Sequence, residues 1–86
     1  MMRMETAGNW PAHERLPVGA RVRVPFPTST LDAEVVIDLG FVGVGGRQLV
    51  HVRALGETDL PKDFDVAVEE VEVLWAPPGR RRRRAA

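Results

Sequence analysis

The sequence predicts a small all-β domain built from five short strands. Several segments alternate polar and apolar residues with period two, which is the pattern of a strand with one buried face. No window of eleven or more residues shows the 3.6-residue period of an amphipathic helix. With 86 residues, of which 44% are hydrophobic, the chain is long enough for one domain with a small core.

The first predicted strand spans residues 21–26 and reads RVRVPF. Its apolar residues alternate with arginines and therefore share one face. Pro25 has no N–H for a ladder hydrogen bond, so the strand lies at a sheet edge or bends at this residue. Residues 25–30, which are rich in proline, serine and threonine, then predict a loop.

Three further strands are predicted over residues 33–39, 48–54 and 64–68, each with an alternating pattern. Residues 69–71 are too few for an α-helix and suit one 3₁₀ turn, after which residues 72–75 form a short fifth strand. The side chains expected to be largely buried are Val22, Val24, Val35, Ile37, Val50, Val52, Phe64, Val66 and Val71.

Two parts of the chain resemble the opening and closing segments of SH3-like and Tudor-like small barrels. They are GARVRV at residues 19–24, and FDV at 64–66 with EEVEVL at 69–74. The resemblance covers residues 16–76 and implies a five-stranded SH3-like barrel. It also implies binding of peptides, RNA or partner subunits rather than catalysis, although a fold does not by itself determine function.

The segments that flank the barrel are expected to be less regular. Residues 1–15 show no sustained period, which predicts an irregular N-terminal arm with Trp10 as its anchor. Residues 77–86 begin with two prolines and a glycine and contain five adjacent arginines, so they predict a disordered tail. We expect one barrel with an extension at each end.

Residues 38–47, DLGFVGVGGR, hold four glycines within seven positions. A phosphate-binding loop would need a Gly-Lys-Ser or Gly-Lys-Thr ending and a following helix, and both are missing here. The glycines instead predict a long hairpin, in which they adopt positive φ or permit close approach. The apolar residues between them, Phe41, Val42 and Val44, are the predicted contact for a protein partner, unless Phe41 folds back to cap the barrel.

The charge is divided unevenly along the chain. Residues 16–76 contain five basic and ten acidic side chains, a net charge of −5, whereas the tail adds five positive charges. For a nucleic-acid interface, the candidate phosphate contacts are Arg80, Arg81, Arg82, Arg83 and Arg84, extended by Arg21, Arg23, Arg47 and Arg53. The alternative is a solvated tail, or one that folds back onto the acidic body.

No catalytic, metal or cofactor site is expected. His13 and His51 lie 38 positions apart and the chain has no cysteine, so a set of three or four metal ligands does not form from sequence neighbours. The carboxylates of Glu69, Glu70 and Glu72 suit a solvated acidic face better than an acid and base pair. The chain also shows no apolar run of membrane-spanning length and no signal peptide, so we expect a cytoplasmic protein that does not enter a membrane.

The function predicted from the sequence is therefore non-enzymatic. We expect a small β-barrel module that docks a protein partner through its loops, because an acidic barrel with an apolar loop suits a protein surface. The alternative is a barrel that binds RNA or DNA, in the manner of transcription- or ribosome-associated barrels, with the arginine tail on the phosphates. An enzyme is the third hypothesis and has no catalytic residues to support it.

Overall fold

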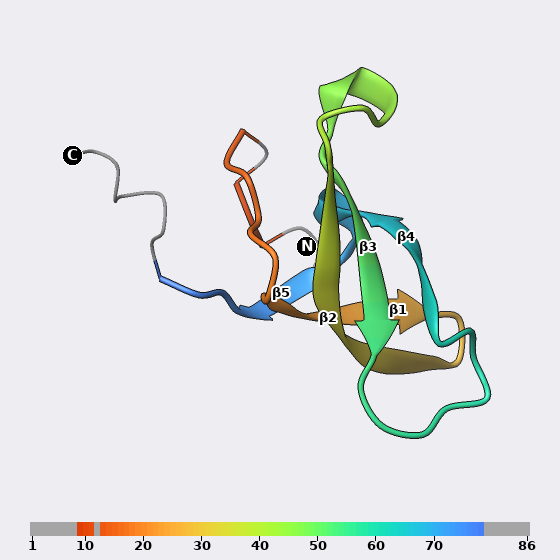
Figure 1. The fold of residues 1–86 in the computed structure, drawn as a ribbon. Helices are drawn as coiled ribbons and strands as arrows, with labels where there is room; N and C mark the ends of the chain where they lie inside the picture. The colour runs from red at the N-terminus through yellow and green to blue at the C-terminus, as the bar shows by residue number, and fades with distance from the viewer. Residues whose placement is uncertain (1–8, 12, 79–86) are drawn as a thin grey trace.

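The computed structural model describes residues 9–11 and 13–78, and this part of the chain is all-β (Figure 1). Its strands are β1 (Arg21–Phe26), β2 (Ser29–Gly40), β3 (Leu49–Ala54), β4 (Asp63–Ala67) and β5 (Glu72–Trp75). Two 3₁₀ turns complete it, η1 (Val44–Gly46) and η2 (Val68–Glu70). The predicted class is confirmed, including the 3₁₀ turn before the last strand.

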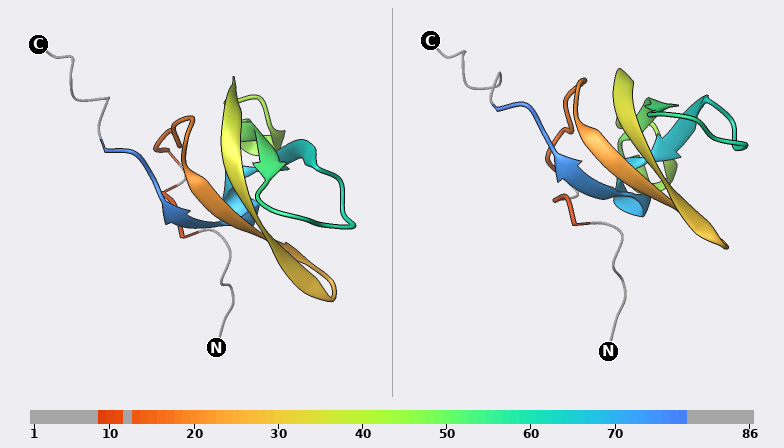
Figure 2. Two further views of the ribbon diagram at one scale, coloured as in Figure 1. Left: turned by 60° about the horizontal axis from the view of Figure 1, so that its bottom comes forward. Right: turned by 90° about the horizontal axis from the view of Figure 1, so that it is seen from below.

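The five strands form one antiparallel sheet in the order β4-β3-β2-β1-β5. The twelve-residue β2 holds the sheet together, because residues 29–34 pair with β1 and residues 33–40 pair with β3. The sheet is strongly twisted and curls around the core (Figure 2). β4 and β5 are its two ends and do not pair with each other, so the curled sheet is open.

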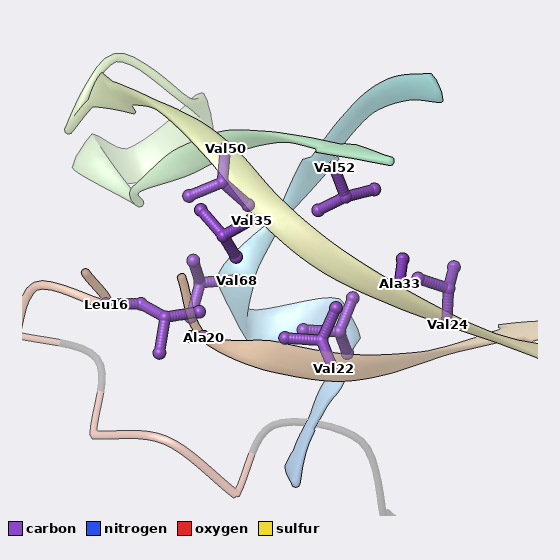
Figure 3. Close-up of a cluster of buried hydrophobic side chains, with 10 residues drawn as sticks. Leu16, Ala20, Val22, Val24, Ala33, Val35, Val50, Val52 and Val68 are labelled. Atoms are coloured by element: carbon purple, nitrogen blue, oxygen red, sulfur yellow. The ribbon is translucent and has the colours of Figure 1, made fainter. Parts of the chain in front are cut away.

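The core lies inside the curl, where valines from β1 face valines from β2 and β3 (Figure 3). Valine suits this position because its branched side chain packs well on a pleated strand. The buried cluster consists of Leu16, Ala20, Val22, Val24, Ala33, Val35, Val50, Val52, Val68 and Val71. Phe64 and Val66 are partly buried and pack against it. The predicted burial is confirmed for the six valines Val22, Val24, Val35, Val50, Val52 and Val71, whereas Phe64 and Val66 are only partly buried and Ile37 is exposed.

The prediction that Ile37 is buried was wrong, since this side chain is 51% exposed. The pairing of β2 with β3 shifts between Val35 and Ile37, so that Val36 is an extra residue without a partner on β3. An extra residue moves the side chains that follow it to the opposite face of the strand. Ile37 and Leu39 therefore face outward, and Asp38 takes the inward side.

The predicted loop at residues 25–30 was also wrong. β1 continues to Phe26 and β2 begins at Ser29, which leaves a turn of only two residues. Pro25 fits into β1 because the pairing of β1 with β5 covers only Arg21 to Arg23. At Pro25 the strand has a neighbour on the β2 side alone, which agrees with the expected edge position.

The N-terminal segment lies against the β5 end of the sheet. The Asn9 side-chain amide donates to the Val73 carbonyl oxygen at 3.0 Å, and the Val73 N–H donates to the Asn9 side-chain oxygen at 2.7 Å. Trp10 packs against the core and its indole N–H donates to the Glu14 carbonyl oxygen at 2.9 Å. Asn9 thus satisfies both backbone groups of Val73 at the free edge of β5.

The bulge at Val36 predicts opposite outcomes for two nearby substitutions. Val35→Ala should lower the free energy of unfolding by about 1–3 kcal/mol, because Val35 is fully buried. Ile37→Ala should change it by less than about 0.5 kcal/mol, because Ile37 is exposed. Urea denaturation of both variants measures this difference, and a larger loss for Ile37→Ala would contradict the register described above.

Candidate functional site

The glycine-rich segment connects β2 to β3 and projects from one end of the sheet (Figure 1). Three of its glycines have positive φ values: Gly40 (88°), Gly45 (74°) and Gly46 (78°). Gly43 has an ordinary φ of −76°, but an added Cβ there would lie 2.9 Å from the carbonyl oxygen of Arg47. The predicted hairpin is confirmed, since its glycines serve both positive φ and close approach.

Internal hydrogen bonds give this loop a defined shape. The Gly43 N–H donates to the Arg47 carbonyl oxygen at 2.8 Å, and the Gly46 N–H donates to the Gly43 carbonyl oxygen at 2.9 Å. The Arg47 guanidinium donates to the Val44 carbonyl oxygen at 3.2 Å and forms an ion pair with Glu69 of η2. The loop is therefore fixed both within itself and to η2, the turn that precedes the last strand.

The apolar residues of the loop form a surface beside a groove. Val42 is 69% exposed and Val44 is 90% exposed. We use the name docking groove for the hollow lined by Val42, Gly43, Val44, Leu49 and Ala67 together with the charged residues Arg47, Glu69 and Glu70. Exposed apolar residues next to charged ones are typical of surfaces that bind other molecules.

Phe41, the third apolar residue predicted to contact a partner, is placed differently. Its side chain is only partly exposed, and the Arg15 guanidinium lies over its ring, 5.0 Å from the centroid. This is a cation–π contact. Phe41 therefore supports the base of the loop, while Val42 and Val44 form its exposed tip.

A buried amide network holds the base of the loop. Gln48 is only 3% exposed; it accepts the Leu16 N–H at 2.7 Å and donates to the Leu16 carbonyl oxygen at 3.0 Å. Its amide also donates to Asp38 at 3.0 Å, and Asp38 accepts the Gly40 N–H at 2.9 Å and pairs with Arg15. Neither Gln48 nor Arg15 could be predicted as part of the site, because a contact across 32 positions leaves no local pattern in the sequence.

The environment of Asp38 keeps it ionised. Partial burial acts to raise the pKa of this carboxyl group. The hydrogen bonds from Arg15, Gln48 and the Gly40 N–H outweigh burial, so the pKa is lowered below its ordinary value. The resulting carboxylate fixes the guanidinium of Arg15 over the ring of Phe41.

Three of the arginines predicted for a nucleic-acid interface lie on the outer face of the sheet, but acids alternate with them. Glu34 stands opposite Arg21 on one side and opposite Arg53 on the other. Arg23 stands opposite Asp32 and pairs with it at 2.9 Å. Cross-strand neighbours share a face of the sheet, so a phosphate chain on this face would meet carboxylates between the arginines.

The remaining predicted arginines are elsewhere. Arg47 is in the loop and is paired with Glu69, as described above. Arg80, Arg81, Arg82, Arg83 and Arg84 lie outside the described residues. The structure therefore brings together Arg21, Arg23 and Arg53 but does not add Arg47 to them.

His51 lies on the outer face of β3 between two aspartates of β4. Its Nδ1 is 2.6 Å from Asp65 Oδ1, and its Nε2 is 3.4 Å from Asp63 Oδ1. The hydrogen bond to Asp65 raises the pKa of His51 above its ordinary value. The aspartates of the neighbouring strand account for the raised pKa. His51 is therefore part of the outer surface of the sheet.

Residues 9–11 and 13–78 contain neither a metal-binding cluster nor a membrane-spanning helix. Within these ranges no group of three or more histidine, cysteine, aspartate or glutamate side chains is arranged to hold a metal ion. The same ranges contain no helix with the length and apolar character needed to cross a membrane.

Replacing Gln48 tests the buried amide network. Gln48→Leu keeps a side chain of similar size but leaves both backbone groups of Leu16 without their partner. We expect a loss of about 1–3 kcal/mol in the free energy of unfolding, the cost of leaving buried polar groups unsatisfied. Chemical denaturation measures it, and a loss below about 0.5 kcal/mol would show that Leu16 finds other partners.

The raised pKa of His51 predicts a pH-dependent stability. Its protonated form is favoured in the folded state, so its contribution is fully present below its unfolded pKa, near 6.5, and is lost as the pH rises through the higher folded value. Asp65→Asn should lower the pKa of His51, measured by NMR titration, and remove this part of the stability. Asp59→Asn, in an exposed loop, is the control and should leave the pKa of His51 unchanged.

Comparisons with known proteins add no assignment to this site. Searches against protein-family models, curated proteins and solved structures find no match for the chain. The functional conclusion therefore rests on the residues described above.

Proposed function

We propose that this protein is a non-enzymatic binding module that docks a protein partner through the docking groove. The observation that carries the proposal is the exposure of Val42 and Val44 on a loop that its own hydrogen bonds hold in place. An apolar surface that is already ordered loses little conformational freedom when it binds, so more of the burial free energy remains as affinity. Covering these valines would add the favourable transfer of apolar area from water.

The charge around the groove indicates which partner surface would fit. Eleven carboxylates and six basic side chains lie within the described ranges. Among the charged residues that line the groove, Arg47 is already paired with Glu69, whereas no ion pair of Glu70 is found among the described residues. A partner with an apolar centre and basic surroundings would complement this surface and be steered toward it.

The nucleic-acid alternative draws less support from the described surface. Arg21, Arg23 and Arg53 share the outer face with at least as many carboxylates, which would repel phosphates. That alternative now depends on residues 80–84.

We further propose that the curled sheet is a small barrel of the SH3-like class. Support comes from the five strands, the 3₁₀ turn before the last strand and the resemblance of residues 16–76 to the opening and closing segments of such barrels. Many members of this class bind peptides or partner subunits, which agrees with a docking role.

Capture experiments with matched variants test the docking role. The purified full chain, treated with nuclease, should retain one or more proteins from a native lysate. The double variant Val42→Ser/Val44→Ser should lose them, because it removes apolar area from the groove while touching no buried residue. We expect at least a roughly tenfold loss of captured protein, equivalent to about 1.4 kcal/mol.

Val18→Ser is the control, because Val18 is also an exposed valine but lies outside the loop. It should retain the same proteins as the wild type. Equal capture by the wild type and the Val42→Ser/Val44→Ser variant would refute docking through the groove. Capture that disappears after nuclease treatment would favour the nucleic-acid alternative instead.

A further inference from the structure

The two ends of the sheet are protected differently. A sheet edge presents backbone N–H and C=O groups that another strand can pair with. At the β5 end, the side chain of Asn9 occupies both groups of Val73. At the β4 end, no described residue bonds to the outward backbone groups of the strand.

The hydrogen bonds at both ends of β4 show which groups are outward. The Ala54 N–H donates to the Lys62 carbonyl oxygen at 2.6 Å, and the Val68 N–H donates to the Gln48 carbonyl oxygen at 3.0 Å. The register between these bonds is unbroken, and antiparallel ladders alternate bonded and non-bonded pairs. Phe64 and Val66 are therefore bonded to β3, and the residues with outward backbone groups are Asp63, Asp65 and Ala67.

The two faces of β4 differ in chemistry. Asp63 and Asp65 are exposed on the outer face, and Phe64 and Val66 are half-buried on the inner face. We propose that β4 is a strand-addition edge for an extended segment of a protein partner, with basic residues facing Asp63 and Asp65 and apolar residues covering Phe64 and Val66. This is a mode of peptide recognition in which backbone bonds supply affinity and side chains supply specificity.

Charge argues for a basic segment rather than a second copy of this chain. Two β4 edges paired antiparallel about their centre would place one Asp65 directly opposite the other, and like charges in that position are destabilising. Asp63 and Asp65 share the single imidazole of His51, so a lysine or arginine opposite either aspartate would still be stabilising.

The proposal rests on the proposed function and deepens it by naming the partner segment. Ala67 belongs to both the β4 edge and the docking groove, because its backbone groups face the open edge and the residue lines the groove. A segment added along β4 would therefore end beside Val42 and Val44. The edge and the groove form one continuous surface.

A capped peptide of alternating lysine and valine is the probe. In an antiparallel addition, the lysines lie opposite Asp63 and Asp65 and make the backbone hydrogen bonds to β4. A peptide methylated on its lysine backbone nitrogens should therefore lose binding, and one methylated on its valine backbone nitrogens should keep it. Both have the same charge, so equal binding of the two by fluorescence anisotropy would overturn the proposal.

A variant of the protein tests a backbone hydrogen bond to the peptide by removing its donor on β4. Ala67 has a φ of −79°, which proline accepts, and its N–H is not needed for the pairing with β3. Ala67→Pro should weaken peptide binding by about two- to tenfold through loss of one hydrogen bond. Ala67→Val keeps the N–H and should weaken binding less than Ala67→Pro does; an equal loss in both variants would indicate that the groove side chain, not the edge, is responsible.

Amide hydrogen exchange on the full chain locates the bound peptide. The peptide should slow exchange at Asp65 and Ala67, and it should change Phe64 and Val66 little because their N–H groups are already bonded to β3. Protection elsewhere would overturn the proposal. So would protection of these amides without peptide. In a dimer this would assign the edge to a second copy, and in a monomer it would assign the edge to another segment of the same chain, such as residues 79–86.

The proposal for the β4 edge and the proposal for the docking groove can be refuted separately. Loss of partner capture in Val42→Ser/Val44→Ser, together with no peptide binding, would leave the proposed function standing and refute strand addition. Peptide binding to the edge, together with unchanged capture by the double variant, would refute the groove and support the edge.

Discussion

The side-chain amide of Gln48 is the interaction on which the rest of the site depends. It pairs with both backbone groups of Leu16 much as a neighbouring strand would, and so brings this segment into the core. A buried amide requires such partners, which makes the arrangement specific. Once Leu16 is fixed, Arg15 reaches Asp38 and lies over Phe41. The base of the glycine-rich loop is thus set by a polar group inside an otherwise apolar core.

The β-bulge at Val36 makes this network possible. Without the extra residue, Ile37 would continue the inward row of β2 and Asp38 would face solvent. With it, Asp38 turns toward Gln48 and can accept its amide N–H. The extra residue Val36 therefore replaces an apolar contact of Ile37 with a hydrogen bond between Asp38 and Gln48. This bond lies at the end of the sheet, next to the loop.

Much of the fold could be predicted from alternation, because a half-buried strand repeats every two residues. The strands and most buried valines follow this rule, and the last 3₁₀ turn could be predicted because the segment before the final strand is too short for an α-helix. The bulge could not be predicted, because Val35, Val36 and Ile37 are all apolar and branched. Their sequence therefore does not show which of the three side chains face the core. The exposure of Val42 and Val44 agrees with their position between glycines. The roles of Asn9 and Gln48 depend on contacts between distant segments, which no local pattern records.

The contact between Asn9 and Val73 joins residues 64 positions apart. During translation Asn9 leaves the ribosome long before Val73 is made. The hydrogen bonds between the two residues therefore form only when β5 has been synthesised and paired with β1. A molecule cut between Asn9 and the core would have a bare edge at each end of its sheet. Two bare edges on one molecule allow neighbours to add head to tail without closing a ring, which is the geometry of a growing fibre. The side chain of Asn9 thus holds the backbone groups of Val73 that a strand added to β5 would need.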